Sequence, residues 1–246
     1  MELINKKYSN PKLAVVIPTY YRSDGKTFSY IKNTLQSVFN QTYKNWKIYL
    51  IGDNYTDKAE FEQIIKLCPP NKILPINLPV AVERKRYPEG GEDLWHSGGT
   101  NSYNVGIEYA INEGYDYICK LDHDDIYFPD HLETLATAIE TTQSPFLYTK
   151  SKYLNSVLPR QNPPELYTNL PPTPINIINS STCINYRIIP LRRRDPLYFY
   201  GRREPGDINF YNRVNPWMKQ HNLKPVFINK LTVDHFEEGY TRNTSF

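Results

Sequence analysis

Cysteine and long apolar segments are both scarce in this sequence. Its three cysteines, Cys68, Cys119 and Cys183, lie far apart among apolar neighbours, which is typical of reduced thiols in a reducing compartment. No segment reaches the roughly 18 apolar residues of a membrane span, and the opening residues MELINKKYSN contain no apolar signal core. We therefore expect a cytoplasmic protein without a transmembrane segment. A peripheral association with the cytoplasmic side of a membrane stays open.

A strong charge surplus and the common glycine motifs are missing too. The 29 basic and 26 acidic residues give a net charge of +3, which is too small to predict a nucleic-acid partner. No G-x-G-x-x-G motif follows a predicted strand, and this excludes a dinucleotide-binding oxidoreductase. The 246 residues are enough for one large α/β domain, and we expect a single domain over residues 1–246.

Apolar strands and amphipathic helices alternate through residues 1–145, which predicts a mostly parallel, Rossmann-like sheet flanked by helices. The expected elements are strands at 13–17, 46–51, 73–82 (an edge strand) and 117–121, and helices at 27–41, 57–67 and 100–114 and from 129 onward. Asp57 and Glu60 have the spacing of a capping box at the second helix. Residues 83–99 are polar and glycine-containing, so we expect a mobile lid there.

Residues 146–246 are richer in proline and predict long connections. We expect a strand over 175–184, a helix that begins at Gly206 with Asp207 as its candidate N-cap, and an apolar strand that starts near 225. This half therefore predicts a C-terminal extension that forms one wall of a cleft against the first half.

Three carboxylates directly follow the apolar strand at 117–121. Asp122, Asp124 and Asp125 would lie at the carboxyl end of this strand, where open α/β sheets bind ligands. Carboxylates this close together repel one another unless protons or a cation intervene. A hard divalent ion held by Asp122 and Asp124 is the functional interpretation, and a solvated turn ahead of a helix is the structural alternative.

The order of several short motifs resembles family 2 of the GT-A fold glycosyltransferases, closely over residues 12–140 and loosely beyond. These motifs are Val16-Ile17-Pro18-Thr19-Tyr20, Leu35-Gln36-Ser37-Val38, Gly52-Asp53-Asn54-Tyr55-Thr56-Asp57, Asn104-Val105-Gly106-Ile107 and Leu121-Asp122-His123-Asp124-Asp125. The resemblance implies a GT-A fold and an inverting hexosyl- or pentosyltransferase. Such an enzyme moves a sugar from a nucleotide diphosphate sugar, most often a UDP-sugar, to a hydroxyl of a glycan or other glycoconjugate. It also implies a nucleotide-sugar-binding half over 1–145, an acceptor-binding half over 146–246, and Mn²⁺ or Mg²⁺ as cofactor.

The same resemblance implies roles for individual residues. The implied donor-binding residues are Pro18, Thr19, Tyr20, Arg22, Asp53, Arg84, Trp95, Asn101, Asp122 and His123. The implied metal ligands are Asp122 and Asp124, with His235 as a later candidate that could instead be structural.

The catalytic base of the family is usually part of a Glu-Asp pair. In this chain Gly206 stands in place of the Glu, so Asp207 is the expected base and Glu204 the reserve, unless Asp207 only caps its helix.

Two departures leave alternatives open. Tyr103 occupies a position where many family members carry an arginine, so a cation for the diphosphate must come from elsewhere. The candidates are Arg84, Lys85 and Arg86, or Arg192, Arg193, Arg194, Arg202 and Arg203.

Because Gly206 replaces the usual Glu, a catalytically inactive nucleotide-sugar-binding module is the alternative function. A sugar-1-phosphate nucleotidyltransferase fits less well, since Gly25 is the only glycine in residues 18–26.

Overall fold

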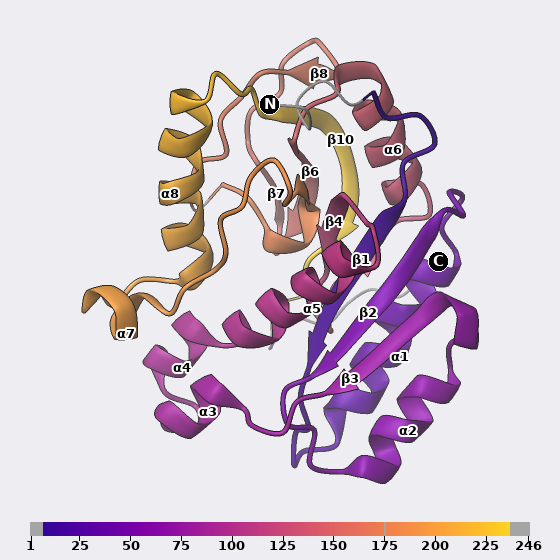
Figure 1. Cartoon of the computed structure of the whole chain (residues 1–246), viewed down its shortest axis with the longest axis vertical. Coiled ribbons are helices and arrows are strands. Elements are labelled where there is room, and N and C mark those ends of the chain that lie inside the picture. Colours follow the sequence, from indigo (N-terminus) through magenta and orange to yellow (C-terminus); the bar gives the residue numbers. More distant parts are fainter. Residues whose placement is uncertain (1–6, 175, 237–246) are drawn as a thin grey trace.

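A single ten-stranded sheet runs through the computed structural model, which describes residues 7–174 and 176–236 (Figure 1). The order of its main strands is β3-β2-β1-β4-β9-β6-β10-β5, and β7 and β8 pair with β6 and β10. The strands are β1 Leu13–Thr19, β2 Trp46–Gly52, β3 Ile73–Asn77, β4 Tyr117–Lys120, β5 Ile126–Tyr127, β6 Phe146–Tyr153, β7 Ser156–Leu158, β8 Tyr167–Thr168, β9 Thr182–Asn185 and β10 Val226–Asp234. The helices are α1 Lys26–Phe39, α2 Lys58–Lys66, α3 Val82–Arg86, α4 Glu92–Ser97, α5 Thr100–Asn112, α6 His131–Thr142, α7 Pro196–Tyr200 and α8 Gly206–Gln220.

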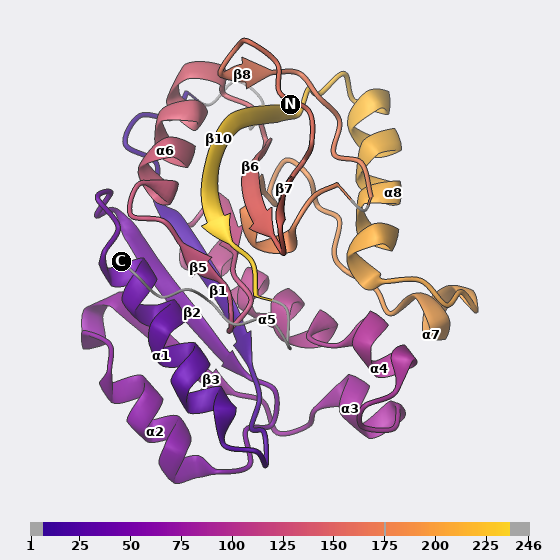
Figure 2. The same ribbon diagram turned by 180° about the vertical axis from the view of Figure 1, so that it is seen from behind.

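The first half of the chain forms the parallel part of the sheet, as predicted. Strands β3, β2, β1 and β4 are all parallel, and β3 lies at the edge. Strand β1 is buried on both faces, which explains its unbroken apolar run. Val15 and Ile17 belong to the core on the side of α1, α2 and α6, whereas Ala14 and Val16 belong to the core on the side of α5 and α8 (Figures 1 and 2).

The second half of the chain extends the same sheet. Strand β9 lies antiparallel between β4 and β6, and β10 continues parallel to β6. As a result, the end of β10 lies beside β5, close to the loop that follows β4. The sheet is therefore mixed, and its second half reaches the carboxyl ends of the parallel strands.

Helix α5 packs unusually close to the sheet. A Cβ atom on Gly106 would lie 2.5 Å from Val16 Cγ1 and 3.0 Å from Ile51 Cγ1, so only glycine fits at this position. The close approach fixes the first turn of α5, which begins after Gly99, against the ends of β1 and β2.

Two local predictions were wrong. The strand expected over 175–184 begins only at Thr182, because Asn179–Ser181 forms a 3-10 turn from which the Ser180 side chain bonds the acidic loop described below; Ile175 itself lies outside the described residues. Residues 83–99, the expected lid, contain most of α3 and all of α4. Asp207 does not cap α8, because Pro205 occupies the N-cap and Asp207 lies in the first turn.

The cap predicted for α2 was confirmed in part. Asp57 caps α2, accepting a hydrogen bond of 2.9 Å from the Glu60 amide, although the Glu60 carboxylate bonds the Tyr55 hydroxyl and does not complete the capping box. All three cysteines are buried and unpaired. Among the helices of the described ranges, none is both long and apolar enough to cross a membrane.

Candidate functional site

A pocket of about 540 Å³ lies at the carboxyl ends of β1, β2 and β4. This is the edge at which parallel α/β sheets bind ligands. The predicted site residues that line it are Pro18, Thr19, Tyr20, Arg22, Asp53, Arg84, Trp95, Asp122, His123 and Asp124. Of the predicted donor-binding residues only Asn101 is not in its lining; its backbone amide donates to Glu83 Oε1 at 3.1 Å. Side chains from three strand ends and from the 83–99 segment therefore share one space.

Arg84, Tyr20 and His123 lie next to one another in the pocket lining, with Arg84 stacked on the Tyr20 ring. The guanidinium carbon of Arg84 lies 3.4 Å from the centre of the Tyr20 ring, and that ring lies 5.0 Å from the ring of His123. Arg84 Nε also lies 3.5 Å from Asp53 Oδ2, and Ser102 Oγ donates to Asp53 Oδ1 at 3.2 Å. Burial raises the pKa of Asp53, while Ser102 and Arg84 act to lower it.

Glu83 is a buried neighbour of Asp53 that the sequence analysis missed. Its side chain is 2% exposed, and Oε2 has no hydrogen-bond partner within the described ranges. Burial and the nearby Asp53 charge raise the pKa of Glu83 to about 7. Glu83 stands in a run of charged residues that predicts a solvated surface, so no sequence signal marked it as buried.

The acidic loop, Asp122 to Asp125, contributes Asp122, His123 and Asp124 to the pocket lining. Asp122 Oδ1 accepts a hydrogen bond of 2.8 Å from the Tyr103 hydroxyl, and its backbone amide donates to Ser180 Oγ at 3.0 Å. Burial and the charge of Asp125 raise the pKa of Asp122. Burial, Asp125 and Asp122 together raise the pKa of Asp124 to about 7. The groups around the loop therefore do not offset all of the negative charge of its carboxylates.

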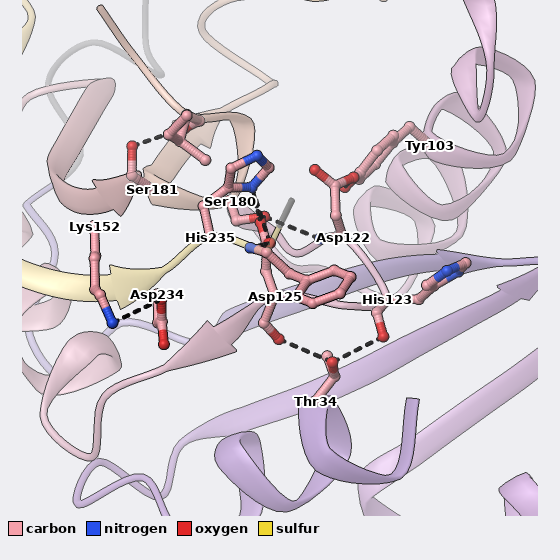
Figure 3. A network of polar contacts seen from close by, with 12 residues as sticks. Thr34, Tyr103, Asp122, His123, Asp125, Lys152, Ser180, Ser181, Asp234 and His235 are labelled. Carbon is pink, nitrogen blue, oxygen red and sulfur yellow. Dashed lines mark hydrogen bonds and ion pairs between the residues drawn. The ribbon is translucent and has the colours of Figure 1, made fainter. Parts of the chain in front are cut away.

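Asp125 connects this loop to distant segments of the chain. It is completely buried and accepts hydrogen bonds from Ser180 Oγ at 2.5 Å, His235 Nδ1 at 2.9 Å and the Phe236 amide at 2.8 Å (Figure 3). The hydroxyl of Thr34 on α1 lies 2.8 Å from the backbone carbonyl oxygens of both His123 and Asp125. Sequence reasoning gave Asp125 no role, because the contacts that define it come from residues far along the chain.

His235 lies at the end of β10 against this network, as Figure 3 shows. Burial alone lowers the pKa of His235. The charge and hydrogen bond of Asp125, together with Asp122 and Asp124, outweigh this effect and raise the pKa to about 9. His235 is therefore protonated at neutral pH and partly compensates the acidic loop when no cation is bound.

The two predicted bases lie outside the pocket lining. Asp207 is in the first turn of α8, where its Oδ1 accepts a hydrogen bond of 2.8 Å from the Ile208 amide. Its charge acts on Arg193 and Lys120 and favours their protonated forms. Glu204 precedes α8, and its Oε1 accepts a hydrogen bond of 2.8 Å from Asn209 on that helix.

Lys120 is a second buried group that sequence reasoning missed. It is completely buried directly before the acidic loop, its Nζ lies 4.6 Å from the centre of the Phe210 ring, and it has no hydrogen-bond partner in the described part of the chain. Burial and the neighbouring Arg193 lower the pKa of Lys120 to about 7, against the opposing effect of Asp207 and Asp122. Its position at the end of an apolar strand gave no sign that its ammonium is enclosed.

The candidate cations divide into those near the pocket and those paired elsewhere. Arg84 lines the pocket, and the Arg193 guanidinium carbon lies 5.3 Å from the centre of the Tyr103 ring, beside the hydroxyl that bonds Asp122. Arg86 instead pairs with Asp195 at 2.6 Å, and Arg192 with Glu108 at 2.7 Å. One residue from each predicted basic cluster therefore approaches the site.

The side chains that could coordinate a metal in the pocket suit a hard cation that is also coordinated by a bound ligand. Across residues 7–174 and 176–236, no three His, Cys, Asp or Glu side chains converge closely enough to hold a metal by themselves. Asp122 and Asp124 nevertheless offer carboxylate oxygens, which Mn²⁺ and Mg²⁺ prefer, and the raised pKa of each shows a charge that a cation would stabilise. These residues fit a metal shared with an oxygen-rich ligand in the pocket.

Comparison with known proteins gives matches over nearly all of the chain. A family model described as glycosyl transferase family 2 matches residues 14–75. An uncharacterised glycosyltransferase of Acanthamoeba polyphaga mimivirus is 34% identical over 248 residues, covering 97% of this chain and 99% of the relative. By contrast, the chain spans only 21% of the length of a Rickettsia felis relative.

Solved structures match at lower identity. Residues 1–349 of TarS from S. aureus, in complex with UDP-GlcNAc, match with a TM-score of 0.66 and 17% identity, over 96% of this chain and 61% of that one. The mannosyltransferase PcManGT from Pyrobaculum calidifontis, in complex with GDP-Man and Mn²⁺, matches with a TM-score of 0.56 and 11% identity, over 96% of this chain and 60% of that one. At these identities the likeness shows a shared fold alone.

Proposed function

Because this chain belongs to glycosyltransferase family 2 and has the GT-A fold, we propose that it is a metal-dependent, inverting transferase. It would move a sugar from a nucleotide diphosphate sugar, with a UDP-sugar favoured, to a hydroxyl of a glycan or other glycoconjugate. The observation that carries this proposal is the convergence of Tyr20, Asp53, Arg84, Asp122 and Asp124 on one pocket of about 540 Å³. The complexes of TarS with UDP and UDP-GlcNAc support a uridine nucleotide as donor.

The nucleotide would bind in this pocket. Asp53 would accept a hydrogen bond from the base. Tyr20, whose ring lies against the Arg84 guanidinium, would line the nucleotide pocket. Pro18, Thr19, Arg22 and His123 line the remaining wall. Trp95, at the outer edge of the pocket, would cover the donor sugar, whereas Asn101 acts only by fixing Glu83 through its amide.

Asp122 and Asp124 would hold Mn²⁺ or Mg²⁺, with His235 as a third candidate ligand. A bound divalent cation supplies charge stabilisation for the departing diphosphate. The hydrogen bond that His235 Nδ1 donates to the Asp125 carboxylate fixes the orientation of the imidazole, as a carboxylate commonly does for a histidine at a metal site. Arg84 and Arg193 place further positive charge near the site, in place of the arginine that Tyr103 replaces.

Asp207 is the proposed general base. A carboxylate within about 3 Å of the acceptor hydroxyl can remove its proton as that oxygen attacks the anomeric carbon from the side opposite the leaving group, which inverts the configuration. The charges of Asp207 and Asp122 both act on Arg193 and Lys120, which supports a position of Asp207 near the acidic loop. Glu204 is the reserve, although its hydrogen bond to Asn209 occupies one of its oxygens.

The deciding experiment compares Asp207→Asn with Glu204→Gln. Transfer or hydrolysis of UDP-sugars is followed with Mn²⁺ present, and donor affinity is measured by calorimetry on the same preparations. We expect Asp207→Asn to bind the donor almost as tightly as the wild type and to lose turnover by at least about a hundredfold, the scale of general-base catalysis. Glu204→Gln should retain most of its turnover.

Full turnover in Asp207→Asn would remove this residue from the mechanism. The alternative, a catalytically inactive nucleotide-sugar-binding module, is favoured by Gly206 where related enzymes carry a carboxylate. It predicts that the wild type binds UDP-sugars but neither transfers nor hydrolyses them.

A further inference from the structure

Helix α7 and the neighbouring α4 carry a group of exposed aromatic side chains. Tyr198, Phe199 and Tyr200 are 61%, 58% and 39% exposed, and Trp95 on the contacting helix α4 is 75% exposed. Both helices lie at the outer margin of the molecule, as Figures 1 and 2 show. Clustered exposed rings of this size mark an interaction surface rather than ordinary solvent-facing residues. We call these four residues, together with Arg194 and Arg202, the α7 patch.

Arginines flank the aromatic residues on both sides. Arg194 Nη1 donates to the Tyr200 hydroxyl at 2.6 Å. Arg203 lies 3.3 Å from Asp93, which offsets its charge. Arg194 and Arg202, however, have no carboxylate partner in the portion of the chain that the structure describes, and both are exposed. The patch therefore combines apolar rings with two arginines that have no carboxylate partner in the described residues, while α4 also carries the exposed carboxylate of Glu92.

We propose that the α7 patch docks the protein onto an anionic membrane surface. Tyrosine, tryptophan and phenylalanine rings partition to the level of the lipid headgroups, and arginine stems lie along apolar surface while their guanidinium groups reach anionic lipids. This surface lies outside the donor pocket except at Trp95, and the proposal does not depend on the chemistry proposed above.

The geometry favours a bilayer over a free anionic glycan. A sugar ring stacks on a flat, open aromatic face, but the Arg86 guanidinium carbon already lies 3.7 Å from the centre of the Tyr198 ring. The rings of Tyr198 and Phe199 stand at 88° to each other and so do not form a platform. Rings that project from a short outer helix are better suited to insertion among headgroups. Docking through α7 would hold the Trp95 edge of the donor pocket close to the membrane, where a lipid-borne acceptor would be presented.

Vesicle binding tests this proposal directly. The full chain is mixed with vesicles of phosphatidylcholine containing 30% phosphatidylserine or with phosphatidylcholine alone, and bound protein is separated by flotation. We expect binding to the anionic vesicles only, with a blue shift of tryptophan emission that Trp95→Phe removes. Replacing both Arg194 and Arg202 by glutamine should weaken binding by roughly 25-fold, since each arginine near such a surface contributes about fivefold. Tyr198→Ser with Phe199→Ser should weaken binding by at least about tenfold.

The matched control removes an exposed ring and an exposed cation elsewhere. Tyr109 on α5 is 45% exposed and Lys219 lies near the end of α8, so Tyr109→Ser with Lys219→Gln should bind vesicles like the wild type. Thermal unfolding checks that every variant is folded. Failure of the wild type to bind anionic vesicles, or equal loss in the control, would overturn the proposal. So would patch-dependent binding of a sulfated heparin oligosaccharide without vesicle binding, which would assign the patch to a glycan.

Discussion

The hydrogen bond between Tyr103 and Asp122 gives the most direct quantitative prediction. The Tyr103 side chain is 1% exposed, and its hydroxyl donates to Asp122 Oδ1 at 2.8 Å. A hydrogen bond to an ionised group contributes about 1.5–3 kcal/mol. Tyr103→Phe removes only the hydroxyl, so we expect the free energy of unfolding at neutral pH to fall by about 2 kcal/mol. For a chain of this size, that corresponds to a fall of about 4–8 °C in Tm.

A second buried tyrosine provides the matched control. Tyr186 is also 1% exposed, but its hydroxyl has no hydrogen-bond partner in the described residues. Tyr186→Phe should therefore leave Tm nearly unchanged. Urea unfolding in EDTA, with a double-mutant cycle of Tyr103→Phe and Asp122→Asn, should give a coupling energy of about 1–2 kcal/mol. Equal stability of the two Tyr→Phe variants, or a coupling energy near zero, would refute the reasoning that this bond holds Asp122 in place.

Two further predictions concern charge in the site. Burial and Asp53 raise the pKa of Glu83 from 4.5 to about 7, so its stabilising contribution is complete below pH 4.5 and is lost as the pH rises through 7. Between pH 5 and pH 8, the free energy of unfolding of the wild type, measured with urea, should fall by about 2–3 kcal/mol more than that of Glu83→Gln. Parallel pH profiles of the two proteins would contradict this. For the cation, Asp124→Asn should abolish the gain in UDP-sugar affinity on adding Mn²⁺ while leaving metal-free affinity similar, and calorimetry showing an unchanged Mn²⁺ dependence would count against Asp124 as a ligand.

The parallel half of the fold was predictable because local patterns decide it. The apolar run at β1 and the helical spacing of Ile31, Leu35 and Val38 on α1 each specify one element, and short connections leave few ways to assemble them. The strand ends then bring Asp53 and Asp122 to one edge of the sheet. Residues that follow a strand directly are therefore the part of a site that sequence places best.

The antiparallel half and the inner layer of the site could not be predicted in the same way. Strand β9 is four residues long and preceded by polar residues, because Ser180 turns toward the acidic loop and does not continue a strand. Likewise, Glu83 is buried where α3 meets α5, and Lys120 is buried beneath Phe210 of α8. Burial of a charged side chain depends on which distant elements meet, and a single sequence does not specify that.

The contacts around Asp125 show how the second half of the chain holds the acidic loop in place. Thr34 from α1, Ser180 before β9 and His235 after β10 all bond the loop that carries Asp122 and Asp124 (Figure 3). The three carboxylates of this loop, Asp122, Asp124 and Asp125, would otherwise move apart, because like charges repel one another. These bonds hold the loop in one conformation, so a nucleotide and cation that bind there would order little of the chain. The C-terminal half therefore fixes the acidic loop, and changes at Ser180 or His235 should weaken binding of the proposed nucleotide-sugar donor although both lie outside the pocket lining.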